Sequence, residues 1–171
     1  MDWHNNLKPM NAILDPPRKI DSKEGTVVFL AGPMSDAPRW HKTVPTLAES
    51  IGIDGVTFLS PMKVTRGFAS HGTAQMNWET WGLAFADVIL FWLPNPAKDN
   101  ATRVYAQTTR VELGEQLALG RKVILGIDDQ ITGADYLRYK ARQYGITTIH
   151  TSLEGCLTEL KQMLDTNASI H

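Results

Sequence analysis

The chain has 171 residues, of which 43% are hydrophobic and 20% are charged, which suits one globular domain and leaves no room for a second full one. Its formal net charge of -1 provides no basic field for polymeric nucleic acid or an anionic membrane. The single cysteine excludes an internal disulfide, and no apolar stretch is long enough to span a membrane. Because no export signal is recognised either, we expect a cytoplasmic protein.

The N-terminal part of the chain contains two different regions. Residues 1–24 are polar and interrupted by prolines, so we expect an N-terminal extension, with the domain itself spanning residues 25–171. An apolar run then stops at Gly32 and Pro33, which is typical of a buried strand followed by a tight turn. Pro45 indicates that the helix after this strand is kinked or begins late.

Strands and helices alternate through the rest of the chain. Asn77 is placed to cap the helix after a long polar loop, and Gly120 follows another helix at a position that glycine favours. The expected strands are residues 26–31, 56–59, 88–93, 123–127 and 146–151, and the expected helices are residues 39–50, 78–86, 109–119, 134–144 and 153–164. This alternation predicts an α/β fold: a single doubly wound, flavodoxin-like domain with a parallel sheet of about five strands in the order 2-1-3-4-5.

Several common motifs are absent from the sequence. Neither a G-x-G-x-x-G dinucleotide fingerprint nor a P-loop follows the first strand, and there is no G-x-S-x-G nucleophile elbow. The five histidines and the cysteine lack the spacing of metal ligands. We therefore predict no metal site and no cofactor.

The best candidate site lies where the predicted strands end. In open α/β sheets, ligands bind beyond the carboxyl ends of the strands, where helix N-termini also project unpaired N–H groups. Glu112 is a carboxylate at the start of the helix after the third strand, and Asp87 heads that strand. Each has a structural alternative, because Thr109 and Glu112 match an S/T-x-x-E capping box and an aspartate before a strand is often a turn or cap residue.

The neighbouring loops supply candidate ligand contacts. Trp40 is a candidate for stacking on a base, although a tryptophan is more often part of a core. Glu79, near the start of a helix, has the simpler role of complementing the helix dipole. We expect a small-molecule ligand to be bound by Gly32, Pro33, Met34, Trp40, His71, Gln75 and Arg110.

Four segments, FLAGPM, PRWHKTVPTL, QMNWETWGLAFADVILFWLP and TTRVELGEQLALGRKVILGI, resemble the nucleoside 2-deoxyribosyltransferase family, in particular its divergent branch. In that family, the glutamate that opens the matching helix attacks the anomeric carbon of a nucleoside sugar, releases the base and leaves a glycosyl-enzyme ester. The matching residue here is Glu112. The family's aspartate at the A-D-hydrophobic strand start, which orients the sugar or the nucleophile, matches Asp87. The resemblance implies an enzyme that cleaves or transfers at the N-glycosidic bond of a nucleoside or a nucleoside 5′-monophosphate.

The chain departs from the family pattern at the first strand. Phe29 aligns with a tyrosine that hydrogen-bonds the nucleophile in well-studied transferases, and phenylalanine cannot donate that bond. A binding module that holds a nucleotide without turnover is therefore an alternative, and so is an interaction protein in which Asp87 and Glu112 are only caps. The acid that protonates the leaving base is not identified by the sequence, and His71 and Asp99 are its candidates.

The resemblance also bears on charge and assembly. Lys98, Arg103 and Arg110 indicate a phosphorylated sugar, although solvated loop charges explain them equally. The positive end of the helix dipole is expected to keep Glu112 ionised at neutral pH. Related transferases borrow a residue from an adjacent chain, so we expect a homo-oligomer, with residues 136–144 as the donor. The aromatic residues Trp78, Trp81, Phe85 and Trp92 crowd a small sheet, which indicates pairing of two 78–86 helices.

Overall fold

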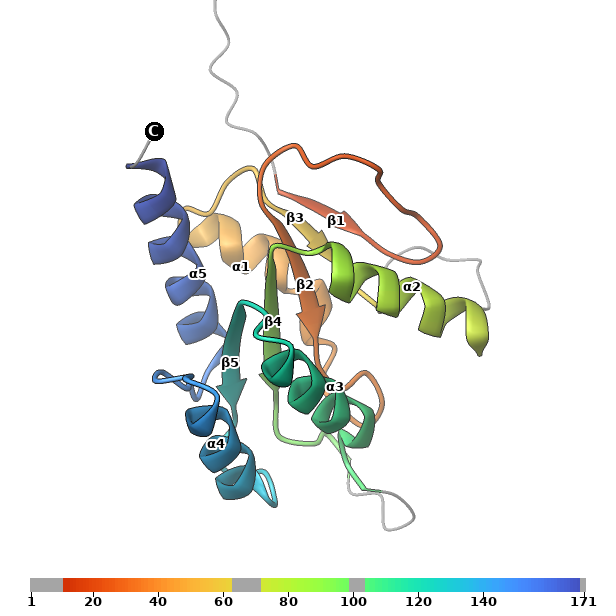
Figure 1. Ribbon diagram of the computed structural model, residues 1–171, viewed down its shortest axis with the longest axis vertical. Helices are drawn as coiled ribbons and strands as arrows, with labels where there is room; N and C mark the ends of the chain where they lie inside the picture. The colour runs from red at the N-terminus through yellow and green to blue at the C-terminus, as the bar shows by residue number, and fades with distance from the viewer. Residues whose placement is uncertain (1–10, 63–71, 99–103, 170–171) are drawn as a thin grey trace, which may run out of the picture.

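The computed structural model describes residues 11–62, 72–98 and 104–169. Within these residues, a five-stranded parallel sheet with the order β1-β3-β2-β4-β5 lies between two layers of helices (Figure 1). The strands are β1 (Ala12–Leu14), β2 (Val27–Ala31), β3 (Thr57–Leu59), β4 (Val88–Leu93) and β5 (Val123–Ile127). This is the doubly wound α/β fold that the sequence predicts.

The helices divide between the two faces of the sheet. They are the short 3-10 helix η1 (Trp40–Lys42), α1 (Val44–Ser50), α2 (Thr73–Phe85), α3 (Gln107–Ala118), α4 (Ala134–Gln143) and α5 (Leu153–Ala168). The first core joins one face to α2, α3 and α4, and the second joins the other face to α1 and α5. Strands covered on both faces need apolar side chains at successive positions, which explains the unbroken runs of β2, β4 and β5.

The two edges of the sheet differ from the predicted arrangement. Residues 12–14 of the expected extension form β1, which pairs with β3 and is anchored by Asn11, whose side chain donates to the Ile53 carbonyl and accepts from the Val56 N–H. The expected last strand, residues 146–151, is represented only by an isolated bridge between Gly126 and His150. The central order of the four other predicted strands is confirmed.

Helix boundaries follow local chemistry. Pro45 lies in the first turn of α1, so the late start is confirmed. Helix α2 begins at Thr73, and Asn77 therefore lies inside it and does not cap it. Gly120, with φ +66°, follows the end of α3 as predicted. None of the described helices is both long and apolar enough to cross a membrane.

The aromatic residues of α2 are packed within one chain. Trp78 is 2% exposed and Trp92 is 7% exposed, while Trp81 stacks on Phe85 with ring centroids 5.2 Å apart. The segment before β2 covers this helix, because the Trp78 indole donates to the Arg18 carbonyl at 2.6 Å. One chain thus accommodates all four rings, with Trp81 and Phe85 still partly exposed, and pairing of two α2 helices stays a prediction.

Candidate active site

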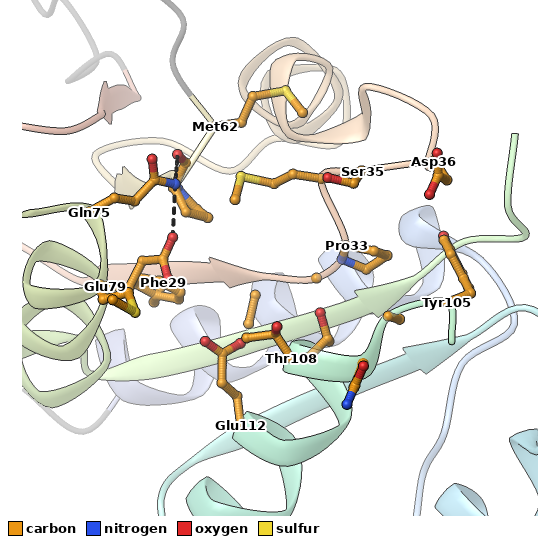
Figure 2. A pocket seen from close by; sticks show the side chains of 18 of the residues that line it. Phe29, Pro33, Ser35, Asp36, Met62, Gln75, Glu79, Tyr105, Thr108 and Glu112 are labelled. Atoms are coloured by element: carbon orange, nitrogen blue, oxygen red, sulfur yellow. Dashed lines mark hydrogen bonds between the residues drawn. The ribbon is translucent and has the colours of Figure 1, made fainter. Parts of the chain in front are cut away.

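A cavity of about 790 Å³ opens at the carboxyl end of the sheet, between α2 and α3. Its walls come from the end of β2 and the following loop, the residues after β3, the first half of α2 and the start of α3 (Figure 2). This is the edge at which parallel α/β sheets bind ligands, because the strand ends leave a crevice there. The volume lies within the range of about 300–1,000 Å³ that is typical of small-molecule sites.

The start of α3 places Glu112 in the cavity. The helix follows Ala106, which lies in the left-handed region with φ +56° and makes no side-chain cap hydrogen bond. Thr109 is buried in the first turn, and Glu112 lies beyond that turn with its carboxylate in the cavity (Figure 2). The helix begins three residues earlier than a capping box at Thr109 requires, so the capping alternative does not describe Glu112.

The environment of Glu112 favours its protonated form. Burial raises the pKa of Glu112 to about 7, and the nearby charges of Glu79 and Glu115 act in the same direction. The expectation that the helix dipole keeps this group ionised is therefore wrong, since the dipole acts mainly within the first turn. Both protonation states of Glu112 are populated near neutral pH.

Glu79 is a second carboxylate in the same cavity, contributed by α2. Gln75, one turn earlier, donates from its Nε2 to Glu79 Oε1 at 2.9 Å (Figure 2). Burial raises the pKa of Glu79, and the hydrogen bond from Gln75 partly opposes that rise. Sequence reasoning assigned Glu79 only to the helix dipole. The four-residue spacing of Gln75 and Glu79 would have indicated that the two side chains meet on one helix face, but only if the helix had been predicted to include both residues.

Phe29 and Tyr105 are the aromatic walls of the cavity. Phe29 is 2% exposed and packs on Trp78. Because it is a phenylalanine, it offers no hydroxyl to either carboxylate. The Tyr105 hydroxyl donates to the Pro94 carbonyl at 2.8 Å, and burial together with the charge of Asp36 raises its pKa. Tyr105 thus ties the start of α3 to the end of β4.

The predicted ligand contacts fall into three groups. Gly32, Pro33, Met34 and Gln75 line the cavity, whereas Arg110 lines an adjoining hollow. Trp40 is 4% exposed and packs beneath Gly32, where an added Cβ would come within 2.6 Å of its ring. Trp40 is therefore part of the core, which was the alternative to its role in stacking on a base. His71, Asp99 and Arg103 lie outside the described residues.

Asp87 lies at the other end of the sheet from Glu112. It heads β4, where its carboxylate accepts from the Val27 N–H at 2.8 Å and pairs with the Lys23 ammonium at 2.6 Å. A residue that precedes a parallel strand lies at the amino edge, while the cavity lies at the carboxyl edge. The structure does not bring Asp87 and Glu112 together, and the contacts of Asp87 match the turn or cap alternative.

We predict that Asp87→Asn lowers stability but not turnover. The exposed pair with Lys23 contributes little, and the weakened hydrogen bond to Val27 costs about 0.5–1.5 kcal/mol. Urea unfolding together with activity per folded molecule measures the two effects. A stable Asp87→Asn protein with strongly reduced turnover would restore Asp87 as a site residue.

The comparisons with known proteins identify the family and the fold. The chain belongs to the nucleoside 2-deoxyribosyltransferase-like family, whose match covers residues 25–130 and includes β2 to β5, Glu79 and Glu112. A solved structure described as a conserved protein from Enterococcus faecalis V583 is 18% identical, with a TM-score of 0.55, over 81% of this chain and 99% of that one. That likeness shows the fold alone. A search of curated proteins found no match.

No cluster of three or more His, Cys, Asp or Glu side chains suited to a metal ion occurs in the part of the chain that the structure describes. Three carboxylates line the cavity, Asp36, Glu79 and Glu112, and the charge of Glu79 acts on the pKa of Glu112.

Proposed function

We propose that this protein cleaves or transfers at the N-glycosidic bond of a nucleoside or nucleoside 5′-monophosphate, with Glu112 as the nucleophile. The observation that carries the proposal is the half-buried Glu112 carboxylate, which shares a cavity of about 790 Å³ with a second carboxylate, Glu79. The family to which the chain belongs supports the same chemistry.

Two carboxylates suffice for a double displacement with retention at the anomeric carbon. In the first step, a Glu112 oxygen bonds to the anomeric carbon as the bond to the base nitrogen breaks, and protonated Glu79 supplies the proton that the leaving base takes up. In the second step, water or another base attacks the anomeric carbon, the ester bond breaks and Glu112 is released as a carboxylate. Ionised Glu79 accepts the proton that this nucleophile loses.

The pH dependence follows from the shared charge of this pair. Each carboxylate disfavours ionisation of the other, so the pair loses its protons in two steps. The larger rise in pKa is that of Glu112, so the single proton of the intermediate form is held mainly by Glu112, and the reactive form is the minor tautomer in which Glu79 has the proton and Glu112 is ionised. We predict a bell-shaped profile of kcat/KM. Activity falls as the pH rises above about 7, because the last proton is lost, and it falls at acid pH, because both groups are protonated.

Initial rates with a stable nucleoside substrate between about pH 4 and 9 measure this profile. Unfolding followed over the same range is the control, since it separates titration of the pair from loss of the fold. A rate that rises steadily through about pH 8 would contradict the shared-proton arrangement.

A binding module without turnover is the second candidate function, and Phe29 favours it because this residue brings no hydroxyl donor to the cavity. Incubation with a panel of nucleosides and 5′-monophosphates, analysed for free base, separates the two candidates. Free base that appears with the native protein supports the enzyme. Saturable binding without any release of base supports the binding module.

The proposal includes a homo-oligomer in which a neighbouring chain covers the cavity. Two exposed apolar side chains line the cavity, Met76 (58% exposed) and Val104 (63% exposed), and a third, Val111 (68% exposed), precedes Glu112 on α3. The tyrosines of α4 and its end, at positions 136, 139 and 144, are exposed by 51–64% and offer a covering surface. Burial of such groups between two chains is favourable.

Sedimentation equilibrium at micromolar concentration is expected to show at least twice the chain mass of 19.0 kDa. Val111→Asp places a charge in this surface and should produce a monomer. Thr46→Asp, on the exposed side of α1 across the sheet, is the matched control and should leave the mass unchanged. A native protein that sediments only as a monomer would refute the oligomer.

A further inference from the structure

A second hollow of about 390 Å³ adjoins the active-site cavity. The two share Asp36, Val104 and Tyr105 as a common wall, and Figure 2 shows Asp36 and Tyr105 together at the end of the cavity away from Gln75 and Glu79. The two hollows therefore lie side by side, and a ligand with its reacting carbon near Glu112 would have to extend along this wall to reach the second one. The two-carboxylate mechanism leaves the second hollow unused.

The lining of the second hollow is cationic and rich in amide and hydroxyl groups. It contains Lys98 and Arg110 against a single carboxylate, Asp36, together with Asn95, Gln130 and Thr132. The Arg110 guanidinium is held in place, because its Nε donates to the Tyr105 carbonyl at 3.2 Å and an Nη donates to the Thr132 carbonyl at 2.9 Å. Lys98 has no ion-pair partner within the described residues.

These groups suit a phosphate. An ammonium point charge beside a fixed guanidinium favours a compact oxyanion with several acceptor oxygens, and neighbouring amides and hydroxyls supply further hydrogen bonds. Asn95 and Gln130 are already joined by a hydrogen bond of 3.2 Å, which holds one side of the hollow. The volume lies within the range of about 300–1,000 Å³ found for whole small-molecule sites, so it exceeds the need of one phosphate group.

We infer that the second hollow binds a phosphate carried by the substrate sugar, and that it has room for a group linked through that phosphate. The inference rests on the proposed function for the position of the sugar. The substrate class is then a nucleotide, either a 5′-monophosphate or a nucleoside joined through its 5′-phosphates to a second group. The phosphate contact is common to both.

Calorimetric titration tests the phosphate contact without turnover. The native protein should bind ribose 5-phosphate at least about tenfold more tightly than ribose, the effect of one charge-assisted contact. Lys98→Met should reduce this preference about tenfold, whereas Lys122→Met, an exposed lysine at the amino edge of the sheet, should leave it unchanged. Lys98 is the better target, because replacing Arg110 would also release two backbone carbonyls. Equal affinity for both sugars, or a preference unchanged by Lys98→Met, would overturn the inference.

A second titration, with ADP-ribose, distinguishes the two sources of the phosphate. ADP-ribose that binds more tightly than ribose 5-phosphate in a Lys98-dependent manner indicates a linked second group, whereas weaker binding indicates a monophosphate. We would repeat both titrations on the Glu112→Gln protein, where no turnover is expected. A Lys98-dependent phosphate preference without any base release by the native protein would support the inference and reject the glycosidic function. Base release by the native protein without a Lys98-dependent phosphate preference would support the glycosidic function and reject the phosphate inference.

Discussion

Glu112→Ala should reduce glycosidic cleavage roughly 10³-fold or more, because the residual protein has no group to form the covalent ester. Glu112→Gln should have the same effect while preserving the shape of the side chain, since an amide is a poor nucleophile. A substrate analogue with a 2-fluoro sugar, which slows the second step, should add its sugar mass to the peptide that contains Glu112 in the native protein only. Turnover retained by a folded Glu112→Gln protein would exclude Glu112 as the nucleophile.

Glu112→Gln should also increase the stability of the fold, and the size of this gain should depend on pH. In the unfolded chain Glu112 ionises near the ordinary glutamate pKa of 4.5, whereas in the folded chain burial raises that pKa to about 7. Ionised Glu112 therefore opposes folding increasingly between these two values and fully above the higher one. We expect Glu112→Gln to unfold with about 1–2 kcal/mol more free energy at about pH 8 and with no gain at about pH 4. Glu115→Gln, on the exposed side of α3, is the control and should show a smaller gain.

The sequence predicted the strands that are buried on both faces and misjudged those at the edges. Strands β2, β4 and β5 are apolar runs between turn residues, and that pattern is local. Strand β1 has only three residues and exists because β3 lies beside it, a contact that local composition does not reveal. Residues 146–151 have an apolar pattern, yet only His150 pairs with β5.

The candidate site was predicted in part, and the errors have geometric causes. Glu112 was predicted because it follows a buried strand on the next helix, and it does line the cavity, but its distance from the helix start was too uncertain to predict its pKa. Glu79 was missed because Asn77 resembled a helix cap, whereas α2 begins at Thr73. Asp87 was grouped with Glu112 although a residue that heads a parallel strand lies at the opposite edge of the sheet.

Glu79→Gln should separate protonation of the leaving base from attack on the sugar. Loss of the acid is expected to reduce cleavage of an ordinary purine nucleoside by about 10²–10⁴-fold, the usual contribution of general acid catalysis. A nucleoside of 7-methylguanine already carries a positive charge on its base and leaves without a proton, so its cleavage should fall by much less. The alkaline limb of the pH profile should also be lost, because the variant no longer has the acid whose deprotonation causes it. Rates with both substrates, measured for the native protein, Glu79→Gln and the control Glu49→Gln on the opposite layer, test this assignment. An equal loss on both substrates would show that Glu79 positions the substrate and does not act as the acid.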